Sequence, residues 1–291
     1  MAMVAEGERD YRPWILLSPS LTAILLLLAI PTCFILVYSF WLRTAVGDEQ
    51  VGFYLNNWSL VLSDPFYRDI LLQTVKIAGI TTVLCAVMGY IPAYFIATTR
   101  LKSKALLLLM LMLPFWVSYI IRTMSWINIL GVSGAVNFVL QGIGLTSEPI
   151  QMLYNESTVI LGLLHFLLPF MIINIYISLD GIDRNLVDAA RSLGARPFQA
   201  FREVTFPLSL PGLAAGGLLC FVLGAGTYIT PLILGGPRDA MFANLIYEAI
   251  IIQLNWPLGA ALSIALLIVL GSVVLLYNRF MGLGQIRKGL S

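Results

Sequence analysis

The sequence predicts an all-α integral membrane protein with six transmembrane helices. Hydrophobic residues make up 59% of the 291 residues, charged residues make up 11%, and the mean hydropathy is +0.90. Soluble domains carry about 25% charged residues, so this chain has too little polar surface to cover a soluble core. Six stretches also reach the roughly 20 largely apolar residues that a membrane-spanning helix needs. The bilayer is therefore the predicted solvent.

The predicted spans share this length and composition. They are Leu16–Trp41, Leu71–Thr98, Ala105–Met124, Thr158–Leu179, Leu213–Leu234 and Leu258–Tyr277. Two weaker stretches, Ser125–Leu145 and Ala243–Trp256, contain glycines, polar residues or a glutamate, and we predict them at the membrane surface or in a vestibule. Counting them as spans would give eight, which is the alternative. The six-helix domain is expected over residues 15–280, between tails at 1–14 and 281–291.

The distribution of basic residues predicts the orientation, because lysine and arginine are enriched in cytoplasmic segments. If both termini are cytoplasmic, 12 basic residues lie on the inner side and 5 on the outer side. The inner set is Arg9, Arg12, Arg100, Lys102, Lys104, Arg184, Arg191, Arg196, Arg202, Arg279, Arg287 and Lys288. The outer set is Arg43, Arg68, Lys76, Arg122 and Arg238. We therefore expect a multi-pass protein of the bacterial inner membrane with cytoplasmic N- and C-termini.

Composition and motifs argue against several functions. A net charge of +2 gives no reason to expect a nucleic-acid partner. Cys33, Cys85 and Cys220 lie in apolar runs without metal-ligand spacing, and the single histidine cannot form a metal site alone. The chain contains no P-loop of the form GxxxxGK[ST], so it is not expected to hydrolyse ATP. We expect a non-catalytic chain that binds no metal and no cofactor.

The charged segment at residues 183–211 interrupts this apolar chain and reads as helix, turn, helix. Asp183 can cap the first helix, Gly194 can take the left-handed conformation that ends it, and Pro197 suits the first turn of the second helix. Pro207 and Pro211 are expected to break the chain before it enters the membrane. An amphipathic element of this kind would suit anionic lipid or a protein groove equally well.

Residues 188–207 resemble a known signature. The permease subunits of binding-protein-dependent ABC importers carry E-A-A-x3-G-x9-I-x-L-P, and this chain has Asp188-Ala189-Ala190, Gly194, Val204, Phe206 and Pro207 at the same spacing. Asp, Val and Phe replace Glu, Ile and Leu. The resemblance implies a coupling helix between spans 4 and 5 that docks on a cytoplasmic ATPase. The implied coupling residues are Asp188, Ala189, Ala190, Arg191, Gly194, Arg196, Val204, Phe206 and Pro207.

The same resemblance implies the partners. These are homodimeric ATPase subunits that bind ATP-Mg, a second homologous permease, and a periplasmic solute-binding protein. Stretches at Phe53–Tyr67, Leu113–Trp126 and Thr227–Ser263 look like the spermidine/putrescine branch, first-permease type. That branch implies a polyamine solute. Relatives for aminobutyrate, opines or ferric iron leave other small solutes as alternatives.

Polar and aromatic residues within or beside spans are candidates for the solute path. They are Trp116, Tyr119, Arg122, Asn174, Thr227 and Tyr228. Arg122 could order a vestibule of Trp116, Tyr119 and Trp126 by cation–π contact, or extend to the interface. Asn174 could instead bond between helices, and His165 could satisfy carbonyls freed by the Pro169 kink.

The predicted span interiors contain no acidic residue, which bears on mechanism. A polyamine could not find a carboxylate cage there, so its recognition would fall mainly to the binding protein. A secondary transporter is the rival class, but it usually carries coupling acids or inverted repeats, and neither is present. A membrane enzyme would need catalytic acids, paired histidines or metal ligands, and His165 alone supplies none of these.

Overall fold

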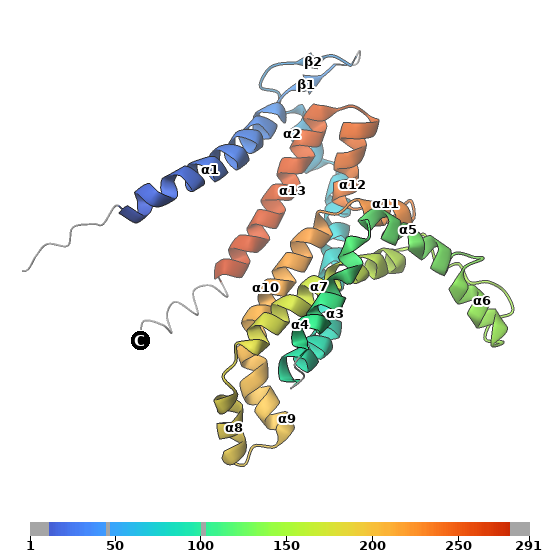
Figure 1. Cartoon of the computed structure of the whole chain (residues 1–291). Helices are drawn as coiled ribbons and strands as arrows, with labels where there is room; N and C mark the ends of the chain where they lie inside the picture. Colours follow the sequence, from blue (N-terminus) through green and yellow to red (C-terminus); the bar gives the residue numbers. More distant parts are fainter. Residues whose placement is uncertain (1–11, 45–46, 100–102, 280–291) are drawn as a thin grey trace, which may run out of the picture.

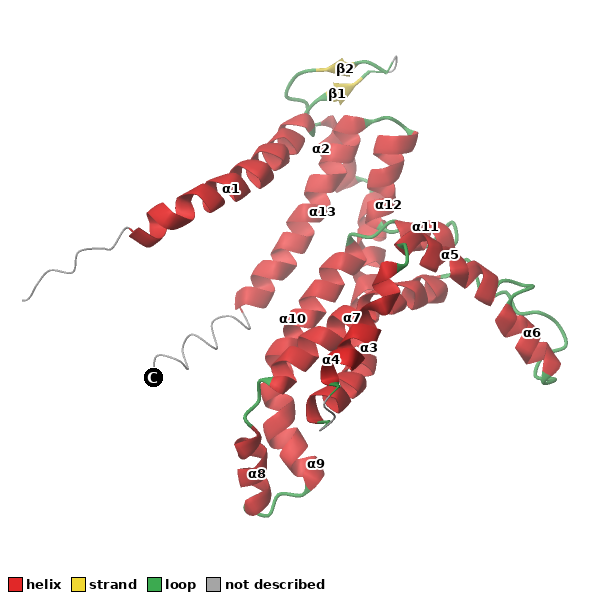
Figure 2. Cartoon of the chain, viewed as in Figure 1, coloured by secondary structure: helices red, strands yellow, loops and turns green. Residues whose placement is uncertain are grey.

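The structure, a computed structural model, describes residues 12–44, 47–99 and 103–279 and consists almost entirely of helices (Figure 2). Within these residues, six helical stretches are long and apolar enough to cross a membrane. This confirms the predicted all-α membrane fold. The predicted tail at 281–291 lies outside the described residues, as do residues 1–11 of the predicted tail at 1–14.

Three long helices form the core: α3 (Pro65–Thr98), α7 (Glu156–Asp180) and α10 (Phe206–Ala225) (Figure 1). Apolar side chains fill the space between them, including the fully buried Ile77, Leu167 and Met171. Glycines allow the helices to approach closely, as is common in membrane bundles. A Cβ atom on Gly212 of α10 would lie 2.4 Å from the carbonyl oxygen of Asn174 on α7, so only glycine fits there.

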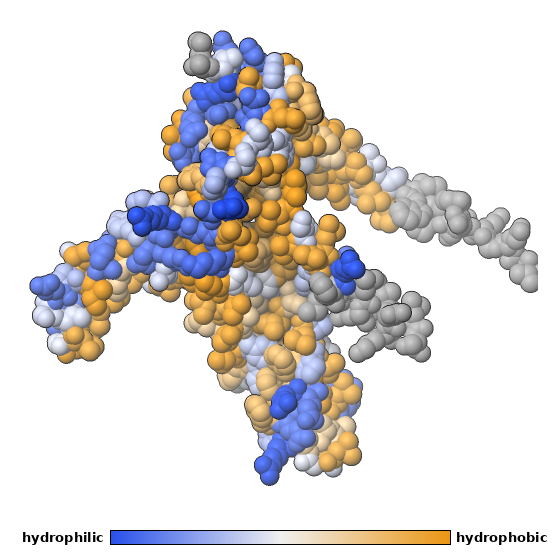
Figure 3. Space-filling view, turned by 180° about the vertical axis from the view of Figure 1, so that it is seen from behind, coloured by the Kyte–Doolittle hydropathy of each residue, from blue (hydrophilic) through white to orange (hydrophobic). Residues whose placement is uncertain are grey.

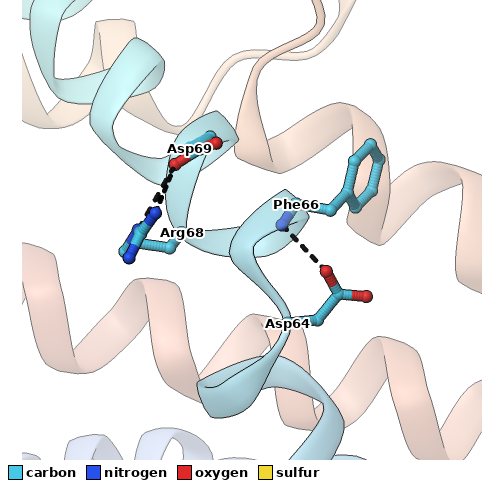
Figure 4. A network of polar contacts seen from close by, with 4 residues as sticks. All are labelled: Asp64, Phe66, Arg68 and Asp69. Carbon is cyan, nitrogen blue, oxygen red and sulfur yellow. Dashed lines mark hydrogen bonds and ion pairs between the residues drawn. The ribbon is translucent and has the colours of Figure 1, made fainter.

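The second span begins at Pro65, six residues before the predicted Leu71. The Asp64 side chain accepts a hydrogen bond of 2.9 Å from the backbone N–H of Phe66 (Figure 4), and Pro65 occupies the first turn of the helix. Arg68 lies beside Asp69 at 3.2 Å, with both side chains exposed. Because these two charges interrupt the apolar run, sequence reasoning placed the helix start too late.

The first span, α1 (Arg12–Tyr38), stands apart from the three-helix core and contacts α13 (Trp256–Tyr277) (Figure 1). It ends three residues before the predicted Trp41, because the carbonyl groups of the next residues form hydrogen bonds with a side chain outside the helix. Asn57 of α2 (Asn56–Ser63) donates to the carbonyls of Ser39 and Trp41 at 3.1 and 2.9 Å. A short antiparallel pair follows, β1 (Leu42–Arg43) with β2 (Glu49–Gln50).

The third predicted span, Ala105–Met124, is not one helix, and this prediction was wrong. It consists of α4 (Lys104–Met112), the 3₁₀ turn η1 (Leu113–Trp116) and α5 (Tyr119–Leu130), with Val117 and Ser118 extended between the last two. Pro114 lacks an N–H group, and its ring clashes with the carbonyl of the residue four positions earlier in a regular helix. The chain therefore tightens and breaks there.

A turn at residues 131–134 separates α5 from α6 (Ala135–Gly142). Asn137 holds this turn by donating to the Gly131 carbonyl at 3.0 Å, and α6 projects from the body of the molecule (Figure 1). Residues 119–142 together are long and apolar enough to span, whereas α4 with η1 is shorter. The placement of residues 125–145 outside the membrane stays a prediction.

The fifth predicted span, Leu213–Leu234, also has different bounds. α10 begins at Phe206 and ends at Ala225, and α11 (Ile229–Leu234) follows a break at residues 226–228. Pro207 and Pro211 lie inside a continuous helical stretch over Pro197–Ala225, so the predicted break at these prolines was wrong.

A π-helical turn, η2 (Phe201–Thr205), explains why the prolines are tolerated. In this wider turn the Phe206 N–H donates to the Phe201 carbonyl. The altered hydrogen-bond register relieves the clash that Pro207 would otherwise make with the carbonyl of Glu203.

Candidate functional site

The residues of the predicted coupling segment form a helical hairpin at one end of the molecule, built from α8 (Arg184–Ser192) and α9 (Pro197–Ala200) (Figure 1). The Asp183 side chain accepts from the Asn185 N–H at 2.9 Å and caps α8. Gly194 has a φ of +90°, the left-handed conformation that ends a helix, and Pro197 opens α9. These three local predictions are confirmed.

The α8–α9 hairpin exposes apolar and cationic side chains together. Leu193 at its tip is 90% exposed and Phe198 is 74% exposed. Arg191, Arg196 and Arg202 also reach the surface, and within the described residues none of them forms an ion pair. Figure 3 shows hydrophilic residues gathered over this end, below a largely hydrophobic body. Such a surface suits a partner that offers an apolar groove edged with acids.

Aromatic packing anchors the α8–α9 hairpin to the core. Phe201 of η2 packs edge-on against Tyr90 and Tyr94 of α3, with ring centroids 5.9 and 5.4 Å apart. Phe206 contacts the Tyr90 ring at 5.8 Å, and the Tyr90 hydroxyl shares a hydrogen bond of 2.8 Å with Ser209. These contacts join η2 and α10 to α3. The hairpin is therefore packed directly against two core helices, α3 and α10.

The predicted coupling residues divide between the surface of the hairpin and its base. Asp188 and Arg191 face a cleft of about 260 Å³ between α8 and the ends of α3 and α7. Ala189 and Ala190 lie on α8, and Arg196 directly precedes α9. The remaining three, Val204, Phe206 and Pro207, lie where the hairpin continues into α10.

Lys104 makes an ion pair and a hydrogen bond beside this cleft that were not predicted from the sequence. The Lys104 ammonium group of α4 donates to the Asp180 carboxylate of α7 and to the Ala97 carbonyl of α3, both at 2.8 Å. One side chain thus links the ends of three helices beside the hairpin. A lysine and an aspartate flanking apolar runs were visible in the sequence, but nothing in it showed that residues 76 positions apart would meet.

A second group of predicted residues meets around Arg122, which is 9% exposed. Its guanidinium carbon lies over the rings of Phe115, Tyr119 and Phe166 at 5.2, 5.9 and 5.8 Å from the centroids. An Nη1 hydrogen bond of 3.0 Å to the Pro114 carbonyl holds the arginine in place. Arg122 therefore makes the predicted cation–π contacts, but with Phe115 and Phe166 in place of the tryptophans.

The Tyr119 hydroxyl joins the two broken helices. It shares a hydrogen bond of 3.3 Å with Thr227, in the break between α10 and α11, and a second one with Thr230 of α11. The break before α5 at Ser118 and the break after α10 at Gly226 thus face each other. Discontinuous helices that meet within a membrane protein leave backbone groups available to a passing solute.

Among the described residues, the contacts of the other path candidates do not include Arg122 or Tyr119. Trp116 is 78% exposed on the surface of η1, and Tyr228 stacks on Tyr247 at 4.9 Å. Asn174 donates to the Phe170 carbonyl of its own helix at 2.9 Å, which does not support the alternative of a bond between helices. His165 accepts a hydrogen bond of 3.2 Å from the indole N–H of Trp126 on α5. The predicted role of His165, at the carbonyls freed by the Pro169 kink, did not anticipate this partner.

The helical core, the hairpin and the broken spans together define a multi-pass membrane permease. Residues 3–283 match the family described as the binding-protein-dependent transport system inner membrane component, and the chain belongs to this family. It is the permease subunit of an ABC importer, located in the inner membrane, and the ATPase is a separate chain.

Several curated relatives cover most of the chain. The spermidine/putrescine transport system permease protein PotB of Escherichia coli K12 is 36% identical over 256 residues, covering 88% of this chain and 93% of PotB. PotB of Haemophilus influenzae is 35% identical over 250 residues, covering 86% and 87%. The inner membrane ABC transporter permease protein YdcU of E. coli K12 is 33% identical, covering 72% and 70%.

Solved structures share the fold. A chain of a bacterial ABC transporter that imports the acidic polysaccharide alginate aligns with a TM-score of 0.71 at 18% identity, covering 94% of this chain and 95% of that one. A chain of the inward-facing MetNI methionine transporter aligns with a TM-score of 0.53 at 18% identity, covering 75% and 97%.

Proposed function

We propose that this permease carries a polyamine, such as spermidine or putrescine, across the inner membrane. The observation that carries the proposal is its 36% identity to PotB over 88% of the chain. A periplasmic binding protein delivers the solute, and a second homologous permease forms the other wall of the path. Two copies of the ATPase bind ATP-Mg and dock on the cytoplasmic side of the two permeases.

Charge distribution supports both the orientation and the solute. The outer segments of the predicted topology, together with the adjoining helix ends, contain eight acidic and five basic residues, whereas the whole chain has 15 acidic and 17 basic residues. The acids are Asp48, Glu49, Asp64, Asp69, Glu148, Glu156, Asp239 and Glu248. An outer face with excess negative charge concentrates cationic solutes near the path. The α8–α9 hairpin and both termini then face the cytoplasm.

The coupling step follows from the hairpin's contacts. The ATPase binds the exposed Leu193, Phe198 and arginines, and its closure moves the hairpin as one body. Phe201 and Lys104 pass this displacement to α3, α4 and α7, whose positions set the opening of the path. Each state is populated according to its differential contacts with the ATPase and the loaded binding protein.

Arg122 favours a second candidate, an importer for an anionic small solute, because it places a fixed cation beside the helix breaks. The molybdenum transport system permease protein ModB of Mycobacterium bovis is 29% identical over 75% of this chain. The two candidates differ in the charge of the solute, so an uptake assay separates them.

The test is uptake by a bacterial strain without its own polyamine importer that expresses this permease with its ATPase, second permease and binding protein. We expect accumulation of radiolabelled spermidine, competition by unlabelled putrescine and no competition by molybdate. Accumulation of molybdate or another small solute, with no spermidine uptake, would contradict the polyamine proposal.

A further inference from the structure

A small cleft lies at the end of the molecule opposite the α8–α9 hairpin, where the first turn of α3 meets η3 (Glu248–Ile252) and the start of α13. Its volume is about 80 Å³. The lining residues of interest are Phe66, Tyr67, Glu248, Gln253, Leu258 and Leu262. This cleft is separate from the aromatic cluster around Arg122 and from the hairpin.

The carboxylate of Glu248 gives this cleft its chemistry. Glu248 opens a π-helical turn, a rare geometry that often marks functional positions, and its side chain is exposed. Gln253 donates to its Oε1 at 3.2 Å, and within the described residues Glu248 forms no ion pair. Arg43 of β1 donates to the Gln253 carbonyl, and within the described residues it forms no ion pair with Glu248.

The remaining walls suit an alkyl ammonium group. Phe66 and Tyr67 contribute two aromatic rings whose centroids lie 5.4 Å apart, and aromatic faces attract cations. Leu258 and Leu262 provide an apolar wall against which methylene groups can pack. Since a liquid water molecule occupies about 30 Å³, the cleft holds an ammonium group with its first methylenes. An anion would meet the Glu248 carboxylate and be repelled.

We propose that this cleft is an outer subsite for the terminal ammonium group of a linear alkyl amine, with Glu248 as its counter-ion. The inference rests on the proposed polyamine function and adds a residue to it. A solute released at the outer face meets a carboxylate and two aromatic rings before it reaches the helix breaks beside Tyr119. Glu248 thereby supplies the acid that the span interiors do not.

Replacing Glu248 by glutamine tests this subsite, because the change removes the charge and keeps the shape. With saturating loaded binding protein, we expect Glu248→Gln to lower the putrescine uptake rate about tenfold, the effect of losing one charge-assisted contact. Glu248→Asp, which keeps the charge, should retain most of the uptake. Asp69→Asn is the matched control, since it removes the same charge at the same end of the molecule but outside the cleft, and its effect on uptake should be much smaller than that of Glu248→Gln.

A labelling experiment reports on occupancy directly. Phe66→Cys is introduced together with Cys33→Ser, because Cys33 is the exposed native cysteine in the described residues. In the complete transporter, we expect putrescine to slow the reaction of the introduced thiol with a cationic thiosulfonate reagent. The protection should disappear when Glu248→Gln is added.

The outcomes separate this inference from the proposed function. If the wild-type transporter takes up putrescine but Glu248→Gln and Asp69→Asn have the same uptake rate, the subsite alone is overturned. The same holds if putrescine still protects the introduced thiol after the carboxylate is removed. Absence of polyamine uptake by the wild-type transporter would overturn the proposed function and the subsite with it. Assembly of each variant is checked by co-purification with the ATPase.

Discussion

Gly194→Val is expected to lower uptake strongly while the chain still inserts into the membrane. Gly194 has a φ of +90°, which a β-branched residue adopts only at a cost of about 1–2 kcal/mol. A Cβ atom there meets nothing within 4 Å, so the whole effect acts through the backbone. To relieve the strain, α8 must rotate away from α9, and the surface presented to the ATPase is lost. Uptake and co-purification of the ATPase should both fall at least about tenfold.

Gly144→Val is the matched control for this prediction. Gly144 also has a positive φ, +74°, with no atom within 4 Å of an added Cβ, but it lies in the loop after α6. The same backbone strain there should leave ATPase binding intact. Gly194→Asn should keep most of the uptake, because asparagine tolerates the left-handed region. Equal loss of ATPase binding in both valine variants would show that the effect is general strain.

Gly212→Ala is expected to lower the stability of the protein by forcing α10 and α7 apart. The added Cβ would lie 2.4 Å from the Asn174 carbonyl oxygen and 2.4 Å from the Cβ of Ser178. Neither atom is the flexible end of a long side chain, so α10 must move away from α7. Overpacking of this kind costs about 1–3 kcal/mol, and the Tm of the purified transporter should fall by about 4 °C or more.

Gly217→Ala on the same helix provides the comparison. Its added Cβ would lie 3.7 Å from a methyl group of Thr82, which is ordinary contact. Because alanine has the higher helix propensity, this variant should match or slightly exceed the wild-type Tm. If both alanine variants unfold at the same temperature, the close approach of α10 to α7 does not limit stability.

The hairpin could be predicted residue by residue because its signals are local. A capping carboxylate at Asp183, a left-handed glycine at Gly194 and a first-turn proline at Pro197 each depend on a few neighbouring residues. The order of the apolar spans, and the approximate bounds of those other than the third and fifth, also follow from composition alone. These features require no knowledge of which helices pack together.

Whether a proline breaks a helix could not be predicted from the local sequence. Pro169 lies within the continuous helix α7, whereas Pro114 coincides with a break between α4 and α5. Pro207 was predicted to break the chain but is accommodated by the π turn η2. Proline thus lies in a continuous helix, at a break or after a π turn. The outcome depends on whether neighbouring helices or a shifted hydrogen-bond register satisfy the backbone carbonyl that the proline leaves without a donor.

The contacts around Arg122 could be predicted only in part. Its burial among aromatic rings follows from the composition of residues 113–126, but the break at Val117 and Ser118 directs Trp116 outward and brings Phe115 beneath the guanidinium. Tyr119 and Thr227 are 108 residues apart, and only the packing of α5 against α11 brings them together. Long-range pairs of this kind leave no local signature.

A thiol at the hairpin tip tests the central claim that a separate ATPase grips this hairpin from the cytoplasm. Leu193→Cys is made with Cys33→Ser, and the protein is treated with a membrane-impermeant maleimide or a benzophenone maleimide. We predict labelling in inside-out but not right-side-out vesicles, and a photochemical crosslink to the ATPase. Leu254→Cys, at the opposite end, should label from the other side. Labelling of the hairpin-tip thiol from outside the cell, or a fully accessible tip thiol that never crosslinks to the ATPase, would contradict the claim.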